Sequence, residues 1–231
     1  MEPVVYTPRL KLTLVTKAER GSPEYEWLHI LWSDEKASFW SFNGRSKSTE
    51  ETEKLIASTF PTPQAGEEKS YRVVYAVHAL LEPWTPGDGT SQPRDQLSEL
   101  IGMVSLRSLN VGFVLPMPEE LMIPAAEAAT TLLAEISYMY LPGAWGKGYA
   151  TESVRAALAA YGRAKSFWAP WERVYVRAIV NGRNRPSARV LDKIMTHKGT
   201  WEWTAPGKPL FIGGEWREQD FLEIYGMHVL E

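Results

Sequence analysis

The stretch that decides the fold runs from residue 141 to residue 167 and reads LPGAWGKGYATESVRAALAAYGRAKSF. The apolar and aromatic residues 132–141 predict a strand entering it. A turn containing Gly146 and Gly148 follows, and a helix is expected to start near Thr151. Residues at i, i+3, i+4 and i+7 form that helix's apolar stripe. They are Val154, Ala157, Leu158 and Tyr161.

The glycine turn has the chemistry of an anion site. Gly146 and Gly148 can bring backbone close to a ligand because neither carries a Cβ. The helix start near Thr151 presents unpaired N–H groups and the positive end of its dipole. The turn therefore predicts a pyrophosphate site, although a tight turn without a ligand fits equally well. A Walker loop does not match, and Thr151 stands where a dinucleotide fingerprint needs its third glycine.

Outside this stretch, hydrophobic periodicity predicts the other elements. Strands are expected at residues 9–14, 71–80, 100–106, 173–180, 200–204 and 221–229. Helices are expected at residues 25–32, from a capping box at Ser48 and Glu51, and from Pro186 to about Met195. The order β-α-α-β-β-β-α-β-α-β-β predicts an α/β fold around one mixed sheet. We expect one domain over residues 1–231, with a core at about 7–229 and an inserted loop at about 82–98.

Composition excludes several classes of function. The 231 residues include 25 Lys+Arg and 28 Asp+Glu, a net charge of −3, so a nucleic-acid partner is not expected. A hydrophobic share of 44% supplies a core and excludes general disorder. The sequence predicts neither a signal peptide nor a membrane span, and we expect a cytoplasmic protein without a membrane partner. The four histidines are scattered, so no metal is expected. Composition does not indicate an oligomeric state.

The turn resembles motif A of the GNAT acetyltransferases, the general-control-related N-acetyltransferase superfamily. That motif reads [QR]-x-x-G-x-[GA], and Gly148 and Ala150 fit it, whereas Trp145 replaces the usual Gln or Arg. The form W-G-x-G-x-A-T-E is typical of the RimJ/RimL-like branch, which includes ribosomal-protein N-terminal acetyltransferases.

Two further segments extend this resemblance from Thr7 to about Gly226. Residues 184–193 resemble the branch's N-x-x-S-x-x-V-L-x-K segment, and residues 7–12 resemble its T-x-R-L-x-L first strand. Residues 193–199 depart from the usual K-x-G-F, and the loop at 82–98 is long for the branch.

The resemblance implies a twisted, splayed sheet of six or seven strands with helices on both faces, and acetyl-CoA as co-substrate. Backbone groups at the end of the strand are expected to meet the pantetheine arm, and Asn184 and Ser187 to face the thioester. The strand-end residues are Met139, Tyr140 and Leu141. The turn expected to wrap the pyrophosphate comprises Trp145, Gly146, Lys147, Gly148, Tyr149, Ala150 and Thr151.

Acetyl transfer to an amine requires that the ammonium lose a proton first. Because the chain has no cysteine, a cysteine acyl-enzyme cannot form, which favours direct attack in a ternary complex. Glu135 is the candidate base, because many GNAT enzymes carry a glutamate on this strand; a solvated carboxylate is the alternative. His78, on a neighbouring strand, is the rival base.

Protonation of the leaving thiolate is assigned to Ser187. Other GNAT branches use a tyrosine here, but none lies between Ile179 and Met195. The branch is thought to use a serine at the matching position, and a hydroxyl can donate to sulfur. Ser187 could equally cap the first turn of its helix, and Asn184 could be a turn residue.

The acceptor is expected to be a primary amine, either of a small molecule or of a protein N-terminus. Phe39, Trp40 and Phe42 could line an apolar acceptor pocket beside His78, or could anchor the core. Two other readings stay open: a GNAT fold that binds acyl-CoA without turnover, and a phosphate-binding domain without CoA.

Overall fold

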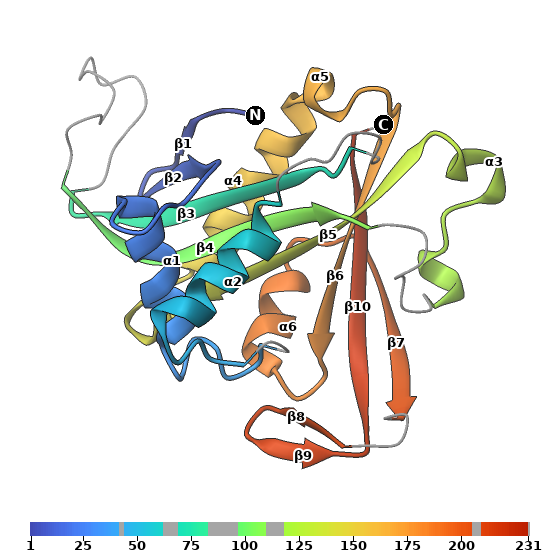
Figure 1. Cartoon of the computed structure of the whole chain (residues 1–231). Coiled ribbons are helices and arrows are strands. Elements are labelled where there is room, and N and C mark those ends of the chain that lie inside the picture. The colour runs from blue at the N-terminus through green and yellow to red at the C-terminus, as the bar shows by residue number, and fades with distance from the viewer. Residues whose placement is uncertain (42–43, 62–68, 83–96, 110–117, 205–208, 231) are drawn as a thin grey trace.

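The computed structural model describes residues 1–41, 44–61, 69–82, 97–109, 118–204 and 209–230. One eight-stranded sheet runs through the molecule in the order β1-β2-β3-β4-β5-β6-β10-β7 (Figure 1). Its strands are β1 (Val4–Tyr6), β2 (Leu10–Val15), β3 (Arg72–Leu80), β4 (Ser98–Ser108), β5 (Thr131–Tyr140), β6 (Arg173–Asn181), β7 (His197–Thr204) and β10 (Gln219–Leu230). A separate hairpin consists of β8 (Leu210–Ile212) and β9 (Glu215–Arg217).

The sheet has more strands than the six or seven expected. β1 is the addition: it pairs antiparallel with β2 but is only three residues long, too short for a period of two to be read. The mixed α/β sheet itself is as predicted, and the expected strands all form. Phe42 and most of the loop expected at 82–98 lie outside the described residues.

Helices cover both faces of the sheet, as predicted (Figure 1). On one face, α1 (Pro23–Ser33) and α2 (Thr49–Thr59) pack their apolar residues on β3 and β4. The opposite face is covered by α4 (Tyr149–Arg163), α5 (Lys165–Trp168) and α6 (Arg185–Leu191). Short turns of helix complete the described chain: η2 (Glu119–Leu121), α3 (Ala125–Ala128) and η3 (Pro142–Ala144).

Local capping explains where the helices begin. The Ser48 hydroxyl accepts from the Glu51 N–H at 3.2 Å, so the predicted capping box does start α2. α4 begins at Tyr149, two residues before the predicted start, because Gly148 adopts a left-handed conformation and serves as N-cap. α6 ends at Leu191, earlier than the apolar stripe to Met195 indicated.

β5 and β6 form the one parallel pair among the described strand pairs of the main sheet. Their register runs from Thr131 opposite Arg173 to Glu135 opposite Arg177, and ends there. β5 continues to Tyr140, paired on its other side with β4, and β6 continues with β10. The two strands therefore part beyond Glu135 and leave facing edges unpaired, which is the splay that the resemblance implied.

Candidate active site

The turn between β5 and α4 has the backbone that a close ligand approach requires. Gly146 and Gly148 have φ values of 73° and 79°, which disfavour any residue with a Cβ. A Cβ at Gly146 would meet nothing within 4 Å, so the space in front of the turn is open. No described side chain caps α4, so its first-turn N–H groups are left for another acceptor. These features fit a pyrophosphate.

A second segment, distant in sequence, holds this turn in place. Arg9, just before β2, donates to the Lys147 carbonyl at 3.0 Å and to the Glu152 carboxylate at 2.8 Å and 2.5 Å. The Thr7 hydroxyl donates to the other Glu152 oxygen at 2.6 Å. The connection between β1 and β2 is thus hydrogen-bonded directly to the glycine turn and to α4. Sequence reasoning missed Arg9 and Glu152 as site residues, although both lie in the quoted motifs.

We expect Glu152→Gln to weaken acetyl-CoA binding by roughly tenfold, because hydrogen bonds to charged groups contribute ~1.5–3 kcal/mol and part of that holds the turn. The control is Glu2→Gln. Glu2 pairs with Arg163 at 2.7 Å and so ties the N-terminal segment to the far end of α4. Calorimetry should find acetyl-CoA binding unchanged in that control. Equal affinities in both variants would refute a role for Glu152 in shaping the turn.

The end of β5 combines core side chains with an accessible backbone edge. Tyr140 is buried against α4, where its hydroxyl lies 2.5 Å from the Ser153 hydroxyl, and burial raises its pKa. Met139 and Leu141 pack on the opposite face with the α1 and α2 cluster. The half-exposed Trp145 donates its indole N–H to the Tyr140 carbonyl at 2.8 Å. Beyond Glu135 the backbone of β5 has no partner in β6, so one edge of this strand end is free of strand pairing.

On the α4 and α6 face, a tyrosine reaches the predicted serine. The Tyr138 hydroxyl lies 2.8 Å from Ser187 Oγ and also donates to the Ser187 carbonyl at 3.1 Å. Burial raises the pKa of Tyr138. Asn184 is the N-cap of α6 and accepts from the Ser187 N–H at 3.3 Å. A tyrosine is thus present at this position, supplied by β5 instead of by residues 179–195.

Glu135 lies on the other face, with α1 and α2, because side chains alternate along β5. One of its oxygens accepts from Arg107 of β4 at 3.0 Å, and the other accepts from Arg177 of β6 at 3.2 Å. The Arg177 side chain is only 2% exposed. Both oxygens of the predicted base are therefore engaged by guanidinium groups, which the sequence did not indicate.

His78 is on the same face as Glu135 but far along the sheet. It pairs with Leu100 on β4, whereas Glu135 pairs with Arg107. Seven residues of strand separate these positions by roughly 23 Å. His78 packs edge-on against Trp27 with ring centroids 4.6 Å apart, and burial together with the Lys11 charge lowers its pKa to about 4. His78 and Glu135 therefore lie on one face of the sheet but do not meet.

The two described aromatic residues of the expected acceptor pocket contact the β8–β9 hairpin. Trp40 is half-buried over Gly213, and Phe39 lies against Gly214. The Gly213 N–H donates to the Phe39 carbonyl at 3.3 Å. Neither residue belongs to a described core cluster: Trp40 packs on the hairpin turn, and Phe39 is 46% exposed.

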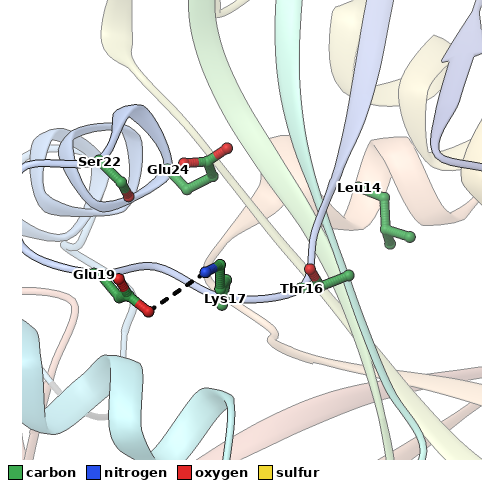
Figure 2. Close-up of a pocket in the computed structure, with 6 residues that line it drawn as sticks. All are labelled: Leu14, Thr16, Lys17, Glu19, Ser22 and Glu24. Atoms are coloured by element: carbon green, nitrogen blue, oxygen red, sulfur yellow. Dashed lines mark hydrogen bonds and ion pairs between the residues drawn. The ribbon is translucent and has the colours of Figure 1, made fainter.

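A shallow hollow lies elsewhere, between the end of β2 and the start of α1 (Figure 2). It has a volume of about 200 Å³, and Lys17 and Glu19 form an ion pair of 3.5 Å at its wall. None of the predicted site residues lines it. The described helices include none that is long and apolar enough to cross a membrane. The described residues also contain no cluster of three His, Asp or Glu suited to a metal ion.

Comparison with known proteins agrees with this geometry. The family model described as "Acetyltransferase (GNAT) domain" matches residues 9–195. The chain therefore belongs to the GNAT acetyltransferase family, which makes it an acyltransferase. A comparison with curated protein sequences finds no match.

Solved structures of GNAT proteins share the fold over nearly the whole chain. A GNAT-family acetyltransferase from Bacillus anthracis is 17% identical, with a TM-score of 0.54 and 98% of each chain covered. Spermidine N-acetyltransferase from Vibrio cholerae, in complex with CoA and spermine, is 18% identical, with a TM-score of 0.53, covering 94% of this chain and 95% of that one. RimL, a ribosomal L7/L12 alpha-N-protein acetyltransferase in complex with coenzyme A, is 16% identical, with a TM-score of 0.54 and 97% of each chain covered.

Proposed function

We propose that the protein transfers an acetyl group from acetyl-CoA to a primary amine by direct attack in a ternary complex, using residues 7–229 as one domain. One observation carries this proposal. β5 and β6 part immediately beyond Glu135, and the opening lies between Glu135 on one face and Ser187 on the other. A thioester in that opening would have a proton acceptor and a proton donor on opposite sides.

Acetyl-CoA would supply the acetyl group as an activated thioester. The chain's part in binding is to present N–H groups from Gly146 to Thr151 to the pyrophosphate and the free edge of β5 to the pantetheine arm. Arg9 and Glu152 keep the turn in its binding shape. The affinity on this account comes mainly from backbone geometry and much less from the charge of Lys147.

On the amine side, Glu135 accepts the proton of the incoming ammonium, directly or through a water. Each Glu135 oxygen already accepts a hydrogen bond from a guanidinium group. One of these two hydrogen bonds must therefore break, or its oxygen must accept from the ammonium as well. We propose that Arg107 is the partner that moves, since its side chain is 58% exposed while Arg177 is buried.

On the thiolate side, Ser187 donates its hydroxyl proton to the sulfur. Tyr138 replaces that proton by turning its O–H from the Ser187 carbonyl to Ser187 Oγ, and water returns a proton to Tyr138. Tyr138 lies within 2.8 Å of Ser187 Oγ, and both are neutral donors at physiological pH, Tyr138 because burial raises its pKa. Asn184 positions Ser187 by capping its N–H. Tyr138 is thus proposed as a positioning residue that acts through Ser187.

Ser187→Ala and Tyr138→Phe should each lower kcat by roughly 3- to 10-fold with acetyl-CoA affinity nearly unchanged. The effect is modest because water can also protonate a thiolate whose reference pKa is about 8.5. The double variant should lose little more than either single variant, because both act on one proton. Tyr75→Phe is the control, since its buried hydroxyl donates elsewhere, to the Glu2 carbonyl at 2.8 Å. Full additivity of the two losses would refute a shared proton path.

The acceptor is either a small-molecule amine or a protein N-terminus. Two proteins with this fold are named for such acceptors, spermidine in one case and a ribosomal protein in the other. An acetyl-CoA-dependent thiol-release assay against a panel of amines tests the proposal. Binding without thiol release for any amine would favour a non-catalytic acyl-CoA-binding module. No thermal shift with acetyl-CoA would favour a phosphate-binding domain.

A further inference from the structure

One row of side chains crosses four strands at the closed end of the splay. Strand register places Arg72 of β3 opposite Arg107, Arg107 opposite Glu135, and Glu135 opposite Arg177. Directly opposed residues share a face of the sheet, so all four side chains lie on the α1 and α2 face. Within these described strands the row, which we call the arginine row, holds three guanidinium groups and one carboxylate.

Within the arginine row itself, three positive charges face one negative charge. Glu135 is shared by Arg107 and Arg177, while Arg72 contacts the Ser70 hydroxyl at 3.2 Å. Like charges placed directly opposite on neighbouring strands destabilise a sheet. Burial, and after it the charge of Arg107, lowers the pKa of Arg72. An added anion would relieve this repulsion.

The arginine row lies beside the opening between β5 and β6. Glu135 and Arg177 are the last pair before β5 and β6 separate, so the row borders the proposed position of the thioester. Arg107, with a side chain 58% exposed, presents its guanidinium on that face. A ligand with an anionic group could therefore reach Arg107 while its amine stays beside Glu135.

The same charges discriminate among amines. A nearby like charge disfavours the protonated form of an amine. An α-amine, with a reference pKa of about 8, loses its proton more readily there than an alkyl amine near 10.4. A polyamine adds further cations beside the guanidinium groups, so it is a poor fit to this row.

Resting on the proposed function, we propose that the acceptor carries its primary amine together with an anionic group, a carboxylate or phosphate, which binds Arg107 and Arg72. Guanidinium groups bind both anions through paired N–H donors. When the anion engages Arg107, that guanidinium turns from Glu135 Oε1 and leaves this oxygen to the ammonium. Substrate binding thereby exposes the proton acceptor.

The test measures kcat/KM for matched acceptors with the full-length wild type and with Arg107→Gln. One arm uses N-terminal peptides that differ only in Asp or Asn at the second position. Another uses a free amino acid, its amide and the corresponding amino phosphonate, and spermidine is included in both. Arg163→Gln is the control variant, since its side chain is 57% exposed and also paired with a glutamate, but on α4. Circular dichroism checks that the variants fold.

We expect the wild type to prefer the anionic acceptor of each pair by roughly 10- to 100-fold, as charged hydrogen bonds allow. Arg107→Gln should bring that ratio close to one, mainly through KM for the anionic acceptor, whereas Arg163→Gln should not change it. The arm with the larger preference for the anionic acceptor shows whether the acceptor is a peptide or a small molecule. Turnover that favours spermidine or the neutral acceptors overturns the inference and leaves the proposed function standing.

If no amine is turned over, the proposed function fails, and binding decides the inference separately. Calorimetry in the presence of CoA should then still find the anionic amines binding more tightly to the wild type than to Arg107→Gln. Equal binding to both proteins overturns the arginine row as an acceptor site.

Discussion

Gly148→Val is expected to weaken acetyl-CoA binding by roughly 10- to 100-fold. Gly148 has a φ of 79°, a conformation that a β-branched residue adopts only with strain on the order of 1–3 kcal/mol. The turn must therefore either carry that strain or change shape, and a change of shape moves the N–H groups that are proposed to hold the pyrophosphate. Isothermal titration calorimetry measures the loss directly.

Two matched variants separate turn geometry from other effects. Gly143, in the same connection, has no positive φ, and a Cβ there would meet nothing within 4 Å, so Gly143→Ala should bind acetyl-CoA like the wild type. Lys147→Ala removes a charge and should cost much less than Gly148→Val. A larger loss from Lys147→Ala would assign the affinity to charge and contradict the backbone account.

Glu135→Gln should lower kcat by about 10²–10⁴-fold, the usual contribution of a general acid–base group, with acetyl-CoA affinity nearly unchanged. The amide keeps the shape of the side chain but cannot accept the ammonium proton. Because the substitution also removes an ion pair of buried Arg177, the melting temperature should fall, so steady-state kinetics should be measured well below it.

Glu127→Gln controls for the loss of a carboxylate near the same strands. Glu127 pairs with Arg173 at 3.8 Å, just before β5 begins. The kcat of Glu127→Gln should stay at the wild-type value. A Glu135→Gln enzyme with wild-type kcat across pH would assign proton removal to bulk water. Equal losses of acetyl-CoA binding and of turnover would make Glu135 a structural residue.

The elements with a regular pattern could be predicted from the sequence, because each is stabilised by residues close to it. Alternation located β3, and the capping box located the start of α2. β1, β8 and β9 have three residues each, so they carry no readable period. The predicted start of α4 is two residues too late, because the helix begins directly after Gly148, its N-cap, and no side chain there marks the cap.

The candidate site also contains a local part that the sequence indicates and long-range contacts that it does not. The glycine turn is local, so its shape could be anticipated from Gly146 and Gly148. The Tyr138–Ser187 contact spans 49 residues of sequence, and Arg9 reaches Glu152 across 143. The arginine row depends on the register of four strands, which no single segment encodes. Pairing between distant strands had to be known before these contacts could be seen.

The central claim is that the opening between β5 and β6 is where an acetyl group passes from acetyl-CoA to an amine. Thiol release measured with saturating acetyl-CoA, with and without a panel of anionic and neutral amines, tests it most directly when mass spectrometry follows the amine. The account predicts thiol release that depends on the amine, with one acetyl group on its nitrogen for each thiol released. Tight acetyl-CoA binding with no amine-dependent thiol release would contradict it.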